Sequence, residues 1–413
     1  MSQEFIEKGY EVVEHHEKAD IYVINTCTVT NMSDRKSRQM LRRVKELNPN
    51  SIVIACGCYV QVAKDEVAKI EDIDLILGNN EKKNIVEHLE QYQKDKKRQL
   101  EIEDLMQQRE FIEFGDVTYT EKTRAVVKIQ DGCDRFCSYC IIPYARGRVR
   151  SRKPEGIISE ITKIAQEGIK EVVITGIHVA SYGKDFKENY GLIDLLEDLN
   201  KIEGIERIRL SSIEPLILDE QFINRLSKLE KICHNFHLSL QSGCDETLKR
   251  MNRRYNTEQF KTVVNLIRNT YKDAILTADV IVGFPGETEE EFEKTYKFLE
   301  DVKFYKTHVF KYSPRKGTKA AVMENQIDGN IKEQRSKKLI ELSNNFEKEY
   351  NESYIGKTVE VLWEEEKEGI YKGHTQNYLL AYYKPEKGDM NLENKITKAN
   401  CISAESDHII VEI

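Results

Sequence analysis

Three cysteines in the middle of the chain have a spacing that suits a metal cluster. Cys133, Cys137 and Cys140 form the pattern C-x-x-x-C-x-x-C, and we call residues 133–140 the cysteine loop. Iron–sulfur clusters are ordinarily held by Cys thiolates, so three thiolates can ligate three irons of a 4Fe–4S cube. The loop supplies no fourth Cys. One iron would therefore keep an open position at which a small molecule can bind.

A zinc site is the alternative for the same residues. Structural zinc takes four protein ligands in a closed tetrahedron, usually from paired C-x-x-C or Cys/His sets. Such a second pair is absent from this run. The spacing therefore favours the iron–sulfur interpretation.

Length and composition bound the class of protein. The 413 residues predict about two to four domains, and 39% hydrophobic with 32% charged residues suits a soluble globular protein. The sequence has neither an apolar run of about 20 residues nor a signal-peptide pattern. We therefore expect a cytoplasmic protein whose nine Cys are metal ligands or thiols rather than disulfides. The net charge of −8 argues against an overall basic nucleic-acid binder, although local patches can still bind RNA.

Short apolar runs alternate with helical patterns in the N-terminal part. Strands are expected at 20–26, 51–57 and 74–79, with a helix at 35–47. This alternation predicts a parallel α/β domain over residues 1–105. From residue 81 to residue 122 the charged, Gln-rich sequence predicts a helix followed by a linker.

Six strand-like runs, separated by amphipathic segments, organise residues 119–350. They begin near residues 125, 171, 207, 236, 276 and 307. Six β/α units without two more predict an open, partial (β/α)6 barrel. Chemistry in such barrels sits at the C-terminal ends of the strands, and the cysteine loop follows the first strand as that rule requires.

The C-terminal part changes pattern. A long polar helix is expected at 331–354, and five short strand patterns follow within residues 351–413. They predict a small all-β barrel, similar in size and strand rhythm to oligonucleotide-binding barrels.

Six sequence segments together carry a resemblance to a known family. They read NTCTVTN, GCYVQ, GCDRFCSYCIIPYARGRVRSR, HLSLQSGCDETLKRMNRRY, DVIVGFPGET and FKYSPRKGTKAA. In this order they resemble the methylthiotransferase branch of the radical S-adenosylmethionine (SAM) enzymes. The resemblance covers nearly the whole chain. It implies an N-terminal cluster domain, a radical SAM core and a C-terminal TRAM domain.

The resemblance implies two 4Fe–4S clusters. The first would be held by the catalytic Cys133, Cys137 and Cys140, with SAM chelated on its open iron. An electron from this cluster would split SAM to a 5′-deoxyadenosyl radical, chemistry that no side chain can do unaided.

The second, auxiliary cluster would be bound by three cysteines of the N-terminal domain, with Cys27 and Cys58 as two of them. Each follows a predicted strand, where the loops of open α/β sheets build sites. Cys56 is expected to be a buried core residue. The family pattern begins with a strand and a Gly-Cys motif that do not appear here. We therefore expect a truncated N-terminal domain and an incomplete auxiliary cluster. The alternative is an auxiliary cluster held by two thiolates and a substitute ligand.

Residues that follow the strands are expected to contact SAM. The expected set is Tyr139, Thr175, Gly176, Glu214, Gln241 and Gly283. The Tyr ring would lie against the adenine, the Thr–Gly pair at the methionine ammonium, and the Glu and Gln at the ribose or carboxylate. The last glycine would let backbone approach the adenine, because it has no side chain. Ordinary turn roles are the alternative for each residue.

Two basic stretches flank the cysteine motifs. One comprises Arg146, Arg148, Arg150, Arg152 and Lys153, and the other Arg35, Lys36, Arg38, Arg42, Arg43 and Lys45. Charge runs are usually solvated faces, but their place beside both motifs favours contact with RNA phosphates. The C-terminal domain is more acidic than basic, so its RNA-binding role rests on the resemblance. Tyr378 or Trp363 could stack a base there, although strand aromatics are more often core residues.

The implied reaction replaces an unreactive C–H bond. The C2–H bond of adenine is neither acidic nor electrophilic, whereas a carbon radical can attack it. The segment IIPYARGRVRSR resembles the branch that acts on N6-threonylcarbamoyladenosine 37 of tRNA, giving the 2-methylthio derivative. Arg146 or Arg148 would face the carboxylate of that base.

The expected partners are the tRNA anticodon stem-loop and an electron donor such as flavodoxin or ferredoxin, with no DNA and no membrane. Alternative substrates are isopentenyladenosine 37 and an aspartate of a ribosomal protein. A non-catalytic iron–sulfur protein that binds RNA or carries electrons is the alternative of another class.

Overall fold

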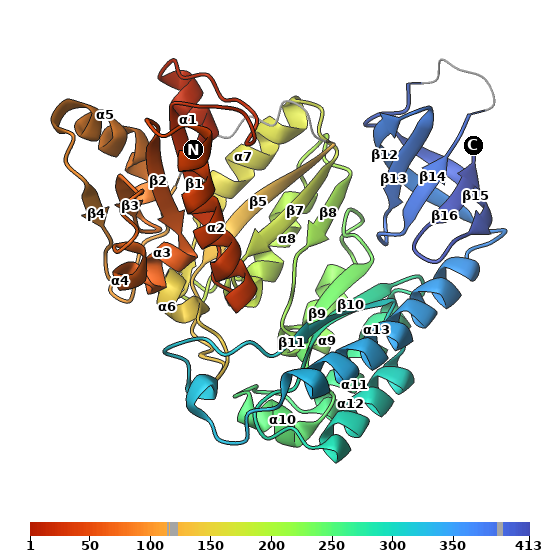
Figure 1. Ribbon diagram of the computed structural model, residues 1–413. Helices are drawn as coiled ribbons and strands as arrows, with labels where there is room; N and C mark the ends of the chain where they lie inside the picture. Colours follow the sequence, from red (N-terminus) through yellow and green to blue (C-terminus); the bar gives the residue numbers. More distant parts are fainter. Residues whose placement is uncertain (114, 116–122, 386–390) are drawn as a thin grey trace. The chain divides into compact units, whose positions relative to one another are not determined.

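The computed structural model describes residues 1–113, 115, 123–385 and 391–413 (Figure 1). The chain forms two compact units, each assembled from separate stretches. The first unit comprises Met1–Thr118, Asp131–Arg150 and Ser313–Val322, and the second unit comprises Tyr119–Gln130, Ser151–Tyr312 and Met323–Ile413. The cysteine loop therefore belongs to the same unit as the N-terminal residues.

A parallel four-stranded sheet forms the centre of the first unit. Its strands, in spatial order, are β1 (Ile21–Thr26), β2 (Ile52–Gly57), β3 (Leu75–Leu77) and β4 (Gln99–Glu101). The first three confirm the strands predicted from their apolar runs. The fourth lies where a linker was predicted, because the short sequence QLE gives no apolar signal.

Five helices and a 3-10 turn accompany this sheet. They are α1 (Ser2–Glu7), α2 (Asn31–Leu47), α3 (Cys58–Val62), α4 (Lys64–Val67), η1 (Glu81–Asn84) and α5 (Ile85–Asp95). Thr30 caps α2 by accepting a hydrogen bond from the Ser33 N–H. Gly57 has φ 104°, and a Cβ there would lie 2.3 Å from the Thr26 carbonyl oxygen. Only glycine permits this approach, so Gly57 fixes where α3 begins.

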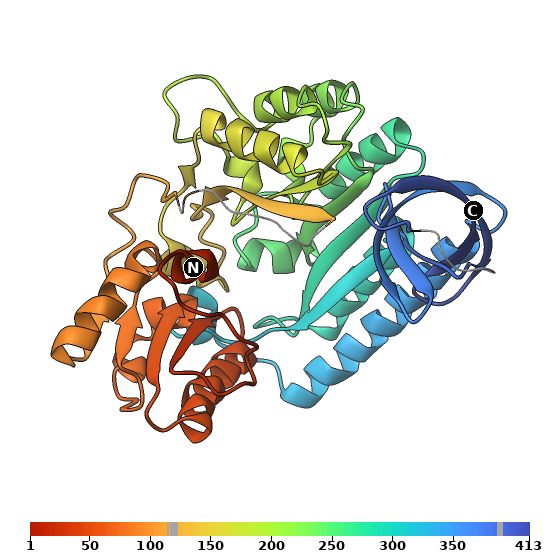
Figure 2. The same ribbon diagram turned by 90° about the horizontal axis from the view of Figure 1, so that it is seen from above.

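An open sheet of six parallel strands forms the centre of the second unit (Figure 2). The strands are β5 (Arg124–Asp131), β7 (Glu171–Gly176), β8 (Arg207–Leu210), β9 (Asn235–Gln241), β10 (Ile275–Val282) and β11 (Lys306–Lys311). Parallel bridges at Ile208–Ile232 and Ile213–Leu238 join the two halves of the sheet. The predicted partial (β/α)6 barrel is confirmed. A two-residue strand, β6 (Arg150–Ser151), was not predicted.

Helices cover the outer face of this sheet. They are α7 (Pro154–Gln166), α8 (Leu192–Asn200), α9 (Glu220–Leu226), α10 (Asp245–Arg250), α11 (Thr257–Thr270) and α12 (Glu289–Val302). Strand residues alternate between the two faces, because the side-chain period of a strand is two. On β9, Phe236, Leu238 and Leu240 are buried in the core that these helices form, whereas His237 and Ser239 are only partly buried. We call the face that carries His237 the inner face.

The last helix, α13 (Gly329–Glu352), leads into a small closed barrel. Its strands are β12 (Thr358–Lys367), β13 (Ile370–Thr375), β14 (Leu380–Tyr383), β15 (Ile396–Ala404) and β16 (Ile409–Glu412). Trp363 is fully buried in this barrel, and its Nε1–H donates to Thr397 Oγ1 at 2.8 Å. The prediction that Trp363 could stack a base is therefore wrong.

A charged joint connects the small barrel to the N-terminal ends of β5, β7 and β8. Glu171 is fully buried and accepts hydrogen bonds from Arg124 at 2.5 Å and from Arg209 at 2.8 Å. Arg124 also pairs with Glu364 of β12 at 2.6 Å. The Tyr378 ring contacts the Arg209 guanidinium, at 4.4 Å from its centroid. Tyr378 thus belongs to this joint, although it is 39% exposed.

Among the described helices, none is long and apolar enough to cross a membrane.

Candidate metal centre

The cysteine loop is closed on the segment that follows it. Gly132 has φ 71°, and a Cβ there would lie 1.8 Å from the Arg148 carbonyl oxygen, so glycine is required. The Cys133 N–H donates to the Gly147 carbonyl at 3.0 Å, and the Cys140 N–H donates to the Cys137 carbonyl at 2.9 Å. The backbone therefore holds the three cysteines in one compact turn.

The sulfur atoms of the loop fit a cluster better than a single ion. Cys137 is buried, and Cys133 and Cys140 are partly buried. In the described part of the chain, no three cysteine sulfurs lie within 4.8 Å of one another. A zinc ion with Zn–S bonds of about 2.3 Å would keep its thiolates closer than this. The three thiols match, in type and number, the Cys ligands of three irons of a 4Fe–4S cluster.

Cys27 and Cys58 lie at one edge of the N-terminal sheet. Strands β1 and β2 are adjacent and parallel, with Thr26 opposite Gly57, so the residues that follow them emerge together. Cys27 is exposed, whereas Cys58 is buried as the first residue of α3. These two thiols fit part of the ligand set of an auxiliary cluster.

Cys56 is a core residue of the N-terminal sheet. Its side chain is fully buried in the core that includes Ile54 and Leu75, as predicted. Burial raises the pKa of its thiol, which disfavours the thiolate that a metal needs.

The segment after the cysteine loop contacts Cys58 directly. Helix α6 (Ile142–Arg146) packs against α3, and Arg146 Nε donates to Cys58 Sγ at 3.1 Å. Asn79 Nδ2 lies 3.8 Å from the same sulfur and donates to the Ala145 carbonyl at 2.7 Å. Burial lowers the pKa of Arg146, but Cys58, Asp131 and Cys27 outweigh it and raise the pKa above its usual value. A persistent cation therefore stands beside the Cys58 sulfur.

The basic stretch at 146–153 is largely structural. Arg150 is 3% exposed and donates to the Arg146 carbonyl at 2.7 Å, and Arg152 pairs with Glu160. The prediction that these arginines form a phosphate-binding face is wrong for the two buried ones. With Arg146 engaged by Cys58, Arg148 is the better candidate for a substrate cation. Its side chain is 42% exposed and lies 3.3 Å from Asp134.

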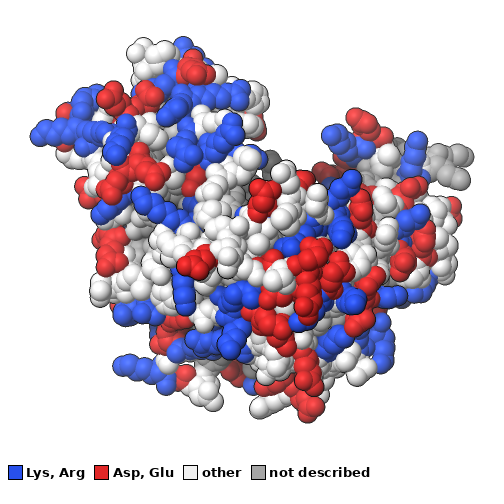
Figure 3. Space-filling view, turned by 60° about the horizontal axis from the view of Figure 1, so that its bottom comes forward, with Lys and Arg blue, Asp and Glu red and all other residues white. Residues whose placement is uncertain are grey.

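Helix α2 presents the other basic stretch to solvent. Arg35, Lys36, Arg42 and Arg43 are exposed. The two remaining cations are engaged locally: Arg38 donates to the Tyr59 hydroxyl at 3.1 Å, and Lys45 donates to the Ser51 carbonyl. On the face drawn in Figure 3, basic and acidic side chains are interspersed, without an uninterrupted basic surface.

Residues 313–322 contact both cysteine motifs of the first unit. Arg315 donates to Thr28 Oγ1 at 2.7 Å and to Asp34 Oδ2 at 2.5 Å, just after Cys27. The Ala320 N–H donates to the Ser138 carbonyl within the cysteine loop at 2.7 Å. Sequence reasoning did not single out Arg315 or Asn79, because only long-range contacts reveal their roles. The one signal was that FKYSPRKGTKAA belongs to the family-like segments.

Two strands of the second unit end in predicted SAM residues. Thr175 and Gly176 end β7, and Gly176 lies opposite Gln130 of β5. Gln241 ends β9 with φ 69°, a conformation that non-glycine residues adopt rarely and that is concentrated at functional sites. Tyr139 lies in the first unit and is partly buried.

Two of the predicted residues have clear structural partners. Glu214 is 4% exposed and binds His178 Nε2 at 3.1 Å. Gly283 has φ 70°, and a Cβ there would lie 2.3 Å from Lys332 Cγ of α13. Packing against α13 therefore also requires this glycine.

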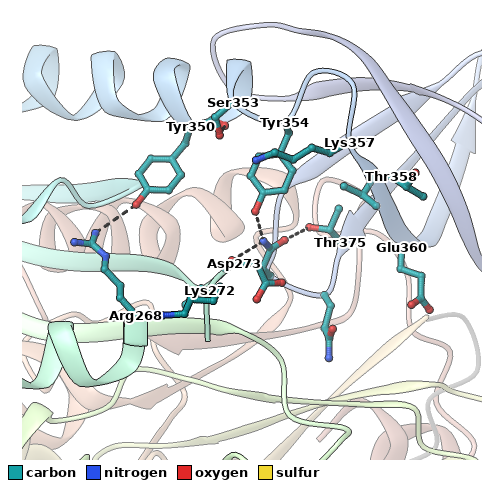
Figure 4. A pocket seen from close by; sticks show the side chains of 14 residues that line it. Arg268, Lys272, Asp273, Tyr350, Ser353, Tyr354, Lys357, Thr358, Glu360 and Thr375 are labelled. Atoms are coloured by element: carbon teal, nitrogen blue, oxygen red, sulfur yellow. Dashed lines mark hydrogen bonds between the residues drawn. The ribbon is translucent and has the colours of Figure 1, made fainter. Parts of the chain in front are cut away.

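A cavity of about 520 Å³ lies apart from these residues, at the joint with the small barrel (Figure 4). Both cationic and acidic side chains line the cavity, among them Arg268, Lys272, Lys357 and Asp273. Asn377 spans the joint by donating to the Asp273 carbonyl at 2.8 Å. The lining includes none of the predicted SAM residues.

Comparison with known proteins places these features in a family context. Residues 127–299 match the Radical SAM superfamily, and residues 1–78 match Uncharacterized protein family UPF0004. The chain is 41% identical to the threonylcarbamoyladenosine tRNA methylthiotransferase MtaB of Bacillus subtilis, over 97% of this chain and 90% of that protein. It is 42% identical to the enzyme of the same name from Aquifex aeolicus, over 92% and 91%.

A tRNA-2-methylthio-N(6)-dimethylallyladenosine synthase from Clostridium botulinum is 36% identical, over 97% of this chain and 91% of that protein. Among solved structures, the radical SAM methyltransferase TsrM from Kitasatospora setae aligns with a TM-score of 0.52 at 15% identity. The alignment covers 71% of this chain and 62% of that one, and it supports the fold alone.

Proposed function

Because the chain belongs to the radical SAM methylthiotransferase family, we propose that it converts N6-threonylcarbamoyladenosine 37 of tRNA to its 2-methylthio derivative. The observation that carries this proposal is the composition of the first unit. It combines the cysteine loop with Cys27 and Cys58, and Arg146 bonds directly to the Cys58 sulfur. Such an arrangement suits a reaction in which two cluster sites serve one substrate.

Each cysteine motif has a distinct role in the proposed reaction. When bound, the cluster of Cys133, Cys137 and Cys140 supplies the electron that splits SAM to a carbon radical able to attack an unactivated C–H bond. Cys27 and Cys58 contribute thiolates to the auxiliary cluster. Arg146 orients the Cys58 sulfur, since the guanidinium fork donates in a fixed direction.

The remaining predicted residues orient SAM. Tyr139 offers an aromatic ring to the adenine, and Thr175, Gly176 and Gln241 offer polar contacts after β7 and β9. Glu214 acts through His178, which it holds by a hydrogen bond. The supporting observation is that Thr175, Gly176 and Gln241 end parallel strands, where barrels of this class place their ligands.

The proposed macromolecular substrate is a tRNA anticodon stem-loop. Base edges are accessible in single-stranded loops, and base-modifying enzymes take their target out of the stack. The exposed cations of α2 provide contacts for backbone phosphates. The electron comes from a donor of the flavodoxin or ferredoxin kind.

Nucleoside mass spectrometry tests the proposal directly. Total tRNA is compared from cells that carry the gene, cells that lack it, and cells that regain it on a plasmid. We expect 2-methylthio-N6-threonylcarbamoyladenosine to disappear on deletion and to return on complementation. Loss of only the 2-methylthio derivative of isopentenyladenosine would contradict the proposed substrate. An unchanged nucleoside profile would contradict tRNA as the substrate.

A further inference from the structure

Four polar side chains form a cluster on the inner face of the second unit. His237 of β9 bonds through Nδ1 to Thr277 Oγ1 of β10 at 2.8 Å. Its other ring nitrogen, Nε2, lies 3.2 Å from Asp279 Oδ2, also of β10. The His308 ring of β11 lies 5.5 Å from the His237 ring. Three neighbouring strands therefore contribute to one polar group.

The core does not require this polarity. The alternate residues of β9 and β10, such as Leu238 and Ala278, are fully buried against the outer helices. The side chains of His237 and Asp279 keep 18% and 28% of their surface exposed, and His308 is more exposed still. Apolar or simple hydroxyl residues would satisfy the sheet equally well. The cluster is therefore open to a ligand and unexplained by the packing of the fold.

The cluster shares its face with a predicted SAM residue. The burial of β9 alternates, and His237, Ser239 and Gln241 are its partly buried residues. The register with β10 shifts at a bulge before Gln241. Four residues at about 3.3 Å each put His237 about 13 Å from Gln241 along the strand. In adenine, C2 and the N6 substituent both flank N1 on the Watson–Crick edge. A base whose C2 is presented near the strand ends therefore also directs its N6 substituent toward this face.

We propose that Asp279 and His308 are specificity-determining residues that bind the N6-threonylcarbamoyl group of the substrate base, and that His237 is a positioning residue for Asp279. This inference rests on the function proposed above. The threonylcarbamoyl group carries urea N–H donors, a carbonyl, a hydroxyl and a carboxylate. Asp279 can accept from the N–H donors with its second carboxylate oxygen, and the His308 ring can donate to an oxygen. His237 positions the Asp279 carboxylate, because its two ring nitrogens are engaged by Thr277 and Asp279.

The same cluster disfavours an isopentenyl group. An all-carbon substituent would cover the three polar side chains without offering hydrogen bonds. Sites built to hydrogen-bond a substrate reject analogues that lack the matching groups, because their own polar groups then stay unpaired. Burial and the neighbouring His237 lower the pKa of His308, which favours the neutral ring with one donor and one acceptor.

Steady-state kinetics of the full chain with two stem-loops test this inference. One stem-loop carries threonylcarbamoyladenosine 37 and the other isopentenyladenosine 37. The test variants are Asp279→Asn and His308→Phe. The second lies at an exposed position of β11, so it does not disturb the core. The matched control is Asp273→Asn, which makes the same substitution outside the inner face. It weakens the contact between His234 Nδ1 and Asp273 Oδ1, which lie 2.8 Å apart.

The preference is the kcat/KM for the threonylcarbamoyladenosine stem-loop divided by that for the isopentenyladenosine stem-loop. We expect each test variant to lower this preference by about 10- to 100-fold, because each loses a hydrogen bond to a charged group. Formation of 5′-deoxyadenosine without RNA should stay unchanged, which separates substrate recognition from the SAM chemistry. The preference of stem-loop binding, measured by fluorescence anisotropy, should fall in parallel. The control should retain the wild-type preference.

The possible failures are distinguishable. Test variants that keep the wild-type preference would overturn the specificity cluster and leave the proposed function standing. A wild-type enzyme that acts only on the isopentenyl stem-loop would overturn both.

Discussion

Replacing Glu171 with Ala should destabilise the second unit more than any comparable change at its surface. The Glu171 carboxylate is fully buried and accepts from Arg124 at 2.5 Å and from Arg209 at 2.8 and 3.3 Å. Arg209 is itself 4% exposed. The substitution therefore leaves a buried guanidinium without its counter-charge, and it loosens the joint to the small barrel at the same time.

Breaking a buried ion pair by removing one partner costs about 3–5 kcal/mol. A domain of this size loses about 2–4 °C in Tm per kcal/mol, so we expect a fall of roughly 10 °C. Circular dichroism during heating measures it. The control is Glu197→Ala, which removes a similar bidentate ion pair, in which Arg225 donates to both carboxylate oxygens of Glu197 at 2.8 Å. Both partners of that pair are about a third exposed, so its loss should cost at most about 1 kcal/mol.

The pH dependence gives a second check on the same residue. Burial raises the pKa of Glu171, but Arg209 and Arg124 outweigh it, so the pKa in the folded state lies below the usual value. The carboxylate then contributes stability above its unfolded pKa of about 4.3, and this contribution is lost as pH falls through the folded pKa. The difference in Tm between wild type and Glu171→Ala should narrow in acid. A Glu171→Ala variant no less stable than the Glu197→Ala control at pH 7 would refute the reasoning.

Three further predictions concern the cysteines. Replacing all three cysteines of the cysteine loop with Ala should abolish 5′-deoxyadenosine formation, measured by chromatography, and residual SAM cleavage would contradict the assignment. Arg146→Met should lower the reduction potential of a cluster bound through Cys58 by on the order of 50 mV. The substitution removes a hydrogen bond and a positive charge, both of which stabilise the reduced state in the wild type. Arg148→Met is the control, and equal potentials by redox titration would exclude this role of Arg146. In the metal-free protein at pH 8, iodoacetamide should modify the exposed Cys27 at least about 10-fold faster than the buried Cys56, whose thiol pKa is raised. Peptide mass spectrometry measures the two rates. Equal rates would contradict the placement of Cys56 in the core.

Features with a local signal could be predicted from the sequence. The apolar runs of β1, β2 and the six barrel strands appeared where expected. The cysteine loop followed β5, and Cys56 proved to be a core residue. Strand β4 was missed because its three residues, of which two are polar, carry no periodic pattern.

Features that depend on distant partners could not be predicted. Arg150 and Arg152 were predicted to contact RNA phosphates, yet partners such as Asp131 and Glu160 allow both to be buried. Trp363 stands in a strand pattern that does not reveal which face is closed off by the barrel. The bond from Arg146 to Cys58 joins residues 88 positions apart, and no local spacing signals it.

The most direct test of the central claim uses the reconstituted full chain with SAM, a reductant and a stem-loop that carries threonylcarbamoyladenosine 37. Mass spectrometry follows 5′-deoxyadenosine and the modified base in the same reaction. The proposed chemistry predicts that both form together, that the base gains a methylthio group at C2, and that an isopentenyladenosine stem-loop is a poor substrate. SAM cleavage without methylthiolation of this stem-loop, alongside efficient methylthiolation of the isopentenyl form, would contradict the proposed substrate.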